Sequence, residues 1–386
     1  MKISILSALL LATLLMGSVI LSACDGTEVK TEKTQTEETT AETTQVTESA
    51  SEATTASASE VVDETVPNGR DTTPYEEITL SGNAEDHFVA TDFCFIEGEK
   101  CVLFLQKDID IPGDYLNNID TIIDEIEVQL GVPYNPEGHK YGSIVDMSVY
   151  WGENPWEDWY IGTKIPIFLV ADYDDAGLIS GATSDFVVLV EYELFSDELW
   201  ESVPSYKDND WRKLDYISYS TAAHEITHAI TSRYCDMTMI MTEGIAEYTE
   251  RKVIEVLGAE DPAFEPTLEN RYLYDNAIPE AINADNAEAT FISDYSYISH
   301  AERGAEYTFG RYLWTFLFEK YGNDSFSKCI EKIKEKNIDY GYGNYDEEAV
   351  TQYADTLKEL FGDDVFTEFG NWCVENNALQ STEGVW

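Results

Sequence analysis

Basic residues are scarce in this chain of 386 residues: 23 lysines and arginines stand against 75 aspartates and glutamates, for a net charge of −52. A chain so short of cations cannot neutralise a phosphate backbone, which argues against nucleic acid as a partner. The same charge disfavours an acidic substrate. Histidine is scarcer still, with five in the chain, so two histidines close together would seldom arise by chance.

Long apolar runs are absent after the first 23 residues, so we expect no further membrane span. Within residues 1–23 the single charged residue, Lys2, is followed by an apolar run, a pattern that is typical of a secretory signal. The ending Leu21-Ser22-Ala23-Cys24 resembles the lipobox of bacterial lipoproteins. It implies cleavage before Cys24 and a lipid anchor on the outer face of the cytoplasmic membrane. The alternatives are a plain signal peptide with an incidental cysteine, or an uncleaved anchor.

Large apolar side chains are also nearly absent from residues 24–72, which are rich in Thr, Glu and Ser. Such a segment cannot bury enough surface to offset the entropy of ordering it. We therefore expect a disordered tether that holds the folded part, from residue 73 onward, away from the membrane. We expect that folded part to be a monomer.

The folded part divides by its pattern of apolar residues. Residues 73–210 contain a strand pair within 86–106, a helix at 115–130 and strands at 165–173 and 185–194. Residues 211–386 are mostly helical, with an irregular connection at 258–303. The predicted helices there are 215–233, 242–257, 304–321, 325–336, 347–362 and 363–375. The fold class is therefore α+β, with a small mixed or antiparallel sheet subdomain followed by a helical one.

The cysteines suggest possible disulfides, and one acidic segment is considered as a calcium site. A disulfide between Cys94 and Cys101 is plausible in an exported protein, and Cys329 and Cys373 form a second possible pair. Cys235 is then left over, and we expect it to be a small buried side chain. The acidic segment 171–177 lacks the ordered spacing of a calcium loop, so we interpret it as solvated, with Ca²⁺ as the alternative.

The stretch His224-Glu225-Ile226-Thr227-His228 carries the clearest chemistry. On a helix the two histidines lie one turn and about 40° apart, so both imidazoles can reach one ion. Imidazole nitrogens suit Zn²⁺, and Glu225 beside them can accept a proton from a water at the metal. The alternative is a core helix with two ordinary histidines.

A catalytic zinc site normally has three protein ligands, so a third is needed. Thr231 and Tyr234 occupy the positions where the metzincin pattern requires glycine and histidine, which excludes that class. Four candidates remain. Cys235 and Asp236 follow the first helix too closely to fold back easily. Glu243 and Glu247 lie on a second helix that can return antiparallel to the first.

The stretch Met241-Thr-Glu-Gly-Ile-Ala-Glu-Tyr248 resembles the Glu-Gly-x-Ala-x-Tyr element of gluzincin metallopeptidases. The resemblance implies a zincin-like arrangement, with the active-site helix between the two subdomains and Glu243 as the third zinc ligand. It extends weakly to residues 307–322. Glu247 is expected to orient His224 through a hydrogen bond, as an acid at this position does in the thermolysin-like members. Gly244 is expected to permit a close approach to the helix of the two histidines.

Gluzincins also stabilise the oxyanion of the reaction with a downstream Tyr or His. The candidates are Tyr295, Tyr297, His300 and Tyr307, of which Tyr307 precedes the family-like helix and ranks first. The strand at 185–194 corresponds to an edge strand that pairs with peptide; an ordinary core strand is the alternative. No Gly-x-Met-Glu-Asn element is present, which favours an endopeptidase. A surface lipoprotein without catalysis, binding a ligand or a cell-wall partner, is the competing hypothesis.

Overall fold

The computed structural model describes the parts of the chain that form the sheet and the helices around it. The described residues are 78–79, 92–106, 108–136, 140–141, 162–171, 180–207, 214, 216–270, 278, 280–293, 303–338 and 347–380. The predicted signal, tether and lipid site at Cys24 lie outside them. So do Tyr295, Tyr297, His300 and residues 172–177 of the acidic segment. In the described part, no helix is long and apolar enough to cross a membrane.

Six strands form one mixed sheet in the order β1-β2-β3-β4-β6-β5. Strands β3, β4 and β6 run parallel, whereas β1, β2 and β5 pair antiparallel with their neighbours. Their bounds are β1 Ile78–Thr79, β2 Asp92–Glu97, β3 Cys101–Gln106, β4 Ile165–Leu169, β5 Gly181–Ala182 and β6 Val187–Leu189. The predicted α+β class, with a small mixed sheet and a mostly helical remainder, is confirmed.

Alternate residues of the central strands face two different cores, because strand side chains alternate between the faces of a sheet. Leu103, Ile167 and Leu189 join the main core with α2 (Tyr115–Leu130) and α6 (Tyr219–Thr231). Phe104 and Phe168, whose rings stack at 4.7 Å between centroids, join a smaller core on the opposite face. That smaller core is completed by α4 (Asp197–Ser202) and α5 (Pro204–Lys207). Helices therefore cover both faces of the sheet.

The strand predicted at 185–194 is an inner strand of the sheet. Only Val187–Leu189 pair, with β4 on one side and β5 on the other, and a short 3-10 helix, η3 (Tyr192–Leu194), follows. The assignment of this segment as the edge strand that pairs with peptide is therefore wrong, and the core-strand alternative holds. The edge position belongs to β5, which the chain reaches before β6, so strand order could not be read from sequence order.

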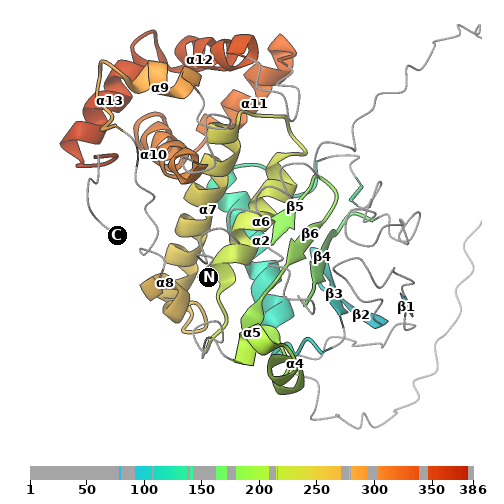
Figure 1. The fold of residues 1–386 in the computed structure, drawn as a ribbon. Helices are drawn as coiled ribbons and strands as arrows, with labels where there is room; N and C mark the ends of the chain where they lie inside the picture. Colours follow the sequence, from blue (N-terminus) through green and yellow to red (C-terminus); the bar gives the residue numbers. More distant parts are fainter. Residues whose placement is uncertain are drawn as a thin grey trace, which may run out of the picture.

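The helical part surrounds one long helix, α7 (Met239–Glu260), which packs against α6 on one side and α10 (Arg303–Tyr321) on the other (Figure 1). Thr238 caps α7 by accepting a hydrogen bond from the Met241 backbone N–H. Helices α11 (Ser325–Lys336), α12 (Glu347–Phe361) and α13 (Val365–Glu375) follow close to their predicted bounds. The connection at 258–303 is less irregular than predicted, since it contains α8 (Glu265–Asn270) and α9 (Ala287–Ser293).

Neither predicted disulfide is present. Cys101, Cys329 and Cys373 are free and buried, and Cys235 is free and half-buried. The register of the β2–β3 hairpin explains the first case, because Cys94 lies opposite Leu105 while Cys101 lies at the turn beside Gly98. Cys101 and the residue opposite Cys94 are four residues apart along the strand, about 13 Å, whereas a disulfide spans about 6 Å between Cα atoms.

Candidate metal centre

Helix α6 carries the two histidines on one face. His224 and His228 are one turn apart, and their Nε2 atoms lie 3.0 Å from each other. The intervening Ile226 and Thr227 are fully buried and anchor the helix in the main core. The amphipathic pattern therefore fixes the side of α6 that faces the core, and the two imidazoles project together beside it.

Helix α7 brings a carboxylate to these histidines. After α6 the chain turns through residues 232–238, and α7 returns against α6. The Oε2 atom of Glu243 lies 3.1 Å from His228 Nε2 and 3.4 Å from His224 Nε2. The three atoms thus form a nearly equilateral triangle. The other three candidate ligands, Cys235, Asp236 and Glu247, are not part of this group.

This triangle fits a metal ion. A tetrahedral ion with bonds of about 2 Å holds its ligand atoms about 3.3 Å apart, close to the three separations found here. Two imidazole nitrogens and one carboxylate oxygen are also a known zinc donor set that leaves a fourth position open. Glu243 is only 8% exposed, so its oxygen is shielded from competing water. The described residues therefore contain a buried His224–His228–Glu243 group that could hold a metal ion.

The charges of the histidines and the carboxylates in the group shift one another's pKa values. Burial alone would raise the pKa of Glu243, but the neighbouring His228 and His224 outweigh this and hold its pKa well below the ordinary range. Burial opposes charge on His224 as well, yet the carboxylates of Glu243 and Glu250 raise its pKa well above the ordinary value. A metal that binds here must displace that proton, so its binding will weaken as the pH falls.

Glu225 lies next to this group on α6 and is half-buried. Burial raises its pKa, the charges of His224 and His228 lower it, and those of Glu243 and Glu250 raise it again, leaving the pKa above its ordinary value. Glu225 is not one of the three grouped ligands. A carboxylate beside a metal position with a raised proton affinity is suited to accept a proton.

Glu250, and not Glu247, takes the position behind the first histidine. The Nδ1 atom of His224 lies 3.2 Å from Glu250 Oε2. Among the described residues Glu247 instead pairs with Arg251, whose Nε lies 3.4 Å from Glu247 Oε2. The assignment of Glu247 as the partner of His224 is corrected accordingly. Glu250 follows Glu243 by two helical turns and so lies on nearly the same face, a spacing by which the sequence could have indicated it.

Glu247 nevertheless stays close to the centre. One of its carboxylate oxygens lies within 4.8 Å of a His224 ring nitrogen and of a Glu250 oxygen. Burial raises the pKa of Glu247, as does the neighbouring Glu250, while His224, Arg251 and Arg311 lower it. Glu247 therefore contributes to the charge around His224 without a hydrogen bond to its ring.

Tyr307 of α10 covers the first histidine. Its ring stacks on that of His224, with 5.9 Å between centroids and 17° between planes. Of the four residues considered for oxyanion stabilisation, it is the one within the described part of the chain. Its ring therefore lies beside the first histidine of the group, and its role in oxyanion stabilisation stays a prediction.

Two glycines bring α10 to this position. A Cβ atom on Gly244 would lie 2.3 Å from the backbone carbon of Gly310, and one on Gly310 would lie 2.0 Å from the Ile240 carbonyl oxygen. Gly244 thus permits a close approach to α10 and not, as predicted, to α6. The contact holds α10 against the first two turns of α7, which places Tyr307, one turn before Gly310, beside His224.

Comparisons with known proteins add no relative to this description. No protein-family model matches the chain, and no curated protein matches its sequence.

Proposed function

We propose that this protein is a zinc metallopeptidase of the gluzincin type, with a zincin-like catalytic unit. The observation that carries the proposal is the triangle of His224 Nε2, His228 Nε2 and Glu243 Oε2, which has Glu225 beside it. A structural zinc site does not need this glutamate, whereas hydrolysis by an activated water does. The resemblance of residues 241–248 to the gluzincin element supports the same reading.

A bound Zn²⁺ would supply a Lewis acid that polarises the scissile carbonyl and lowers the pKa of a water. Glu225 accepts a proton from that water and later donates it to the leaving amine. Glu250 accepts a hydrogen bond from His224 Nδ1 and so keeps Nε2 free for the ion. We assign to Tyr307, whose ring stacks on His224, the donation of a hydrogen bond to the developing oxyanion.

We also propose that the enzyme acts at the cell surface on peptide or protein substrates. A lipid on Cys24 would anchor it to the outer face of the bacterial cytoplasmic membrane, and the tether would let it reach peptide or protein substrates there. The absence of an aminopeptidase element favours cleavage within chains over trimming of amino termini.

The test combines metal analysis with hydrolysis. We expect the purified full chain to contain about one zinc per molecule, to cleave a casein-type substrate and to lose that cleavage on treatment with a chelator. Glu225→Gln should abolish cleavage and keep the zinc. Glu255→Gln, an exposed site on α7, is the matched control and should keep both. Stoichiometric zinc without cleavage, unchanged by Glu225→Gln, would contradict the enzyme and favour a binding lipoprotein.

A further inference from the structure

Two carboxylates of α7 lie within reach of one imidazole N–H. The Nδ1 atom of His224 is 3.2 Å from Glu250 Oε2. Glu247, three residues earlier on the same helix, has an oxygen within 4.8 Å of a His224 ring nitrogen and of a Glu250 oxygen. A charge-assisted hydrogen bond spans about 2.8 Å, so a shift of about 2 Å or less, which a change of side-chain torsion can supply, would bring Glu247 to the ring.

Arg251 holds Glu247 in its present place. It follows Glu247 by one helical turn, and its Nε atom lies 3.4 Å from Glu247 Oε2. The side chains of Arg251 and Glu247 are 16% and 21% exposed, so water screens their attraction less than it would at an open surface. Glu247 thus has a positively charged partner on its own helix, whereas Glu250 faces His224.

A second guanidinium, that of Arg311 on α10, acts on the same carboxylate. Burial and Glu250 raise the pKa of Glu247. The charges of His224, Arg251 and Arg311 lower it. Arg311 is 5% exposed, so its charge is fixed inside the protein. Positive charges from two helices therefore favour an ionised Glu247 that stays beside the imidazole ring without bonding to it.

The choice between the two carboxylates decides how the ring of His224 is turned. The Nδ1 atom carries one hydrogen, and the acceptor of that hydrogen fixes the ring and the direction of Nε2. Nε2 now lies 3.0 Å from His228 Nε2 and 3.4 Å from Glu243 Oε2. Glu247 is about 4.5 Å from Glu250 along the helix axis. A bond to Glu247 would therefore turn the ring and open the triangle of ligand atoms.

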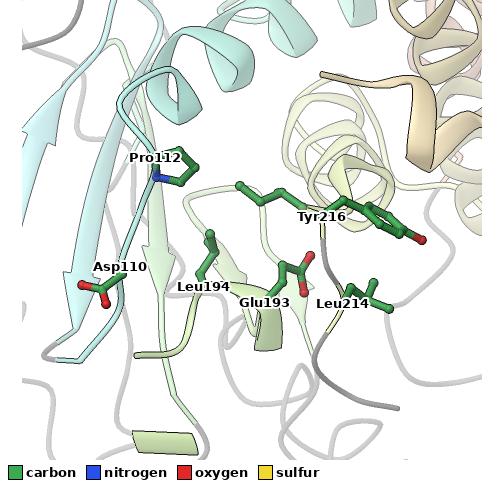
Figure 2. Close-up of a pocket in the computed structure, with 7 residues that line it drawn as sticks. Asp110, Pro112, Glu193, Leu194, Leu214 and Tyr216 are labelled. Carbon is green, nitrogen blue, oxygen red and sulfur yellow. The ribbon is translucent and has the colours of Figure 1, made fainter. Parts of the chain in front are cut away.

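The pocket before the start of α6 is a separate feature. It has a volume of about 240 Å³, and Figure 2 shows it with the side chains that line it. Those residues are Asp110, Pro112, Glu193, Leu194, Leu214, Tyr216 and Ile217. None of them belongs to α7 or to the group around His224. A substitution at Arg251 therefore acts at the metal centre and not on the lining of the pocket.

We propose that Arg251 is a positioning residue of the metal centre. By pairing with Glu247 it leaves Glu250 as the one carboxylate that orients His224. The crossing of α6 over α7 places Glu250 at the ring, and Arg251 keeps the second carboxylate from taking its place. Because His224 matters as a ligand, this role of Arg251 rests on the proposed metallopeptidase function.

The experiment is a double-mutant cycle on the zinc affinity of the full chain, measured by competition with a chromogenic chelator. Glu250→Ala alone should weaken zinc binding by about 10- to 100-fold. With Arg251→Gln added, Glu247 is released to accept the Nδ1–H bond, so the loss should shrink to about threefold or less. Arg251→Gln alone should stay within about threefold of the parent, because Glu250 remains at the ring.

Three further variants are the controls. Lys252→Gln removes the same charge from the next residue of α7, where Lys252 is 41% exposed and lies 3.3 Å from Glu255. Combined with Glu250→Ala it should restore no affinity. Arg251→Lys keeps the charge beside Glu247 and should also restore none. Adding Glu247→Ala to the double variant should abolish the recovery, because the replacing carboxylate is then gone.

A second measurement needs neither metal nor hydrolysis. In the metal-free protein with isotope-labelled histidine, the Nδ1–H proton of His224 gives an NMR signal as long as a hydrogen bond protects it from exchange with water. We expect this signal in the parent, its loss in Glu250→Ala and its return when Arg251→Gln is added. A protein that cleaves no peptide or binds no zinc contradicts the proposed function, and the NMR signal still decides the role of Arg251.

The role of Arg251 is overturned if the double variant binds zinc as weakly as Glu250→Ala and the NMR signal does not return. It is also overturned by a recovery that survives Glu247→Ala, since another group would then hold the ring. Two zinc ions per parent chain, one of them lost in Glu247→Ala, would show that His224, Glu247 and Glu250 bind a metal of their own. That result would overturn the proposal as well.

Discussion

Gly244 of α7 and Gly310 of α10 meet backbone against backbone, one residue beyond the metal-ligand candidate Glu243. Neither position has room for a Cβ atom, so two helices that carry different parts of the site are held at the closest distance their backbones allow. Trp314 strengthens this contact one turn later, where its Nε1–H donates a hydrogen bond of 2.9 Å to the Met241 carbonyl. The position of Tyr307 over His224 follows from this packing.

The Gly310→Ala variant should be strongly destabilised, because its Cβ would overlap the Ile240 carbonyl oxygen. We expect the free energy of unfolding to fall by about 2–3 kcal/mol or more, measured by chemical denaturation. Gly181→Ala is the control, since no atom lies within 4 Å of its Cβ position. Equal stability of the two variants would show that α10 does not pack on α7 as described.

Removing Glu243 should cost far more zinc affinity than removing Glu247. The Glu243 oxygen faces both histidines, whereas Glu247 pairs with Arg251. We expect Glu243→Ala to lose stoichiometric zinc in competition with a chromogenic chelator, and Glu247→Ala to retain it. If both variants bind zinc like the parent, the third ligand is a different residue.

Glu250→Ala should weaken zinc binding by about 10- to 100-fold, because His224 would lose the carboxylate that orients its ring. The same chelator competition measures this loss, and Glu255→Ala on the same helix controls for a change of charge. A larger effect from Glu247→Ala than from Glu250→Ala would restore the assignment made from the sequence.

Glu191 should make the stability of the protein depend on pH. Burial and Glu193 raise its pKa in the folded state, whereas the unfolded value is about 4.3. Between these values the folded protein holds a proton that the unfolded chain releases, so stability falls as the pH rises above about 4.3. Glu191→Gln does not titrate. Its melting temperature relative to the parent should therefore increase from pH 5 to pH 8, and a constant difference would contradict the raised pKa.

Elements governed by local pattern were predicted well. Helix α2 has the predicted bounds, Tyr115–Leu130, and α11 has Ser325–Lys336, since apolar spacing decides both. The grouping of His224 with His228 follows for the same reason, because one helical turn relates them. The short helices α8 and α9 were missed, as each is too brief to show a clear periodicity.

The sequence alone determined which residues could form a metal centre. The two histidines are related by the spacing of one helical turn, and the carboxylate on the next helix belongs to a stretch that resembles the gluzincin element. Only the tertiary structure decided which carboxylate supports His224, which helix Gly244 meets and which strand forms the edge of the sheet. Each of these depends on the rotation and order of elements packed side by side. Glu247 and Glu250 lie on similar faces of α7, and the crossing of α6 over α7 selects Glu250.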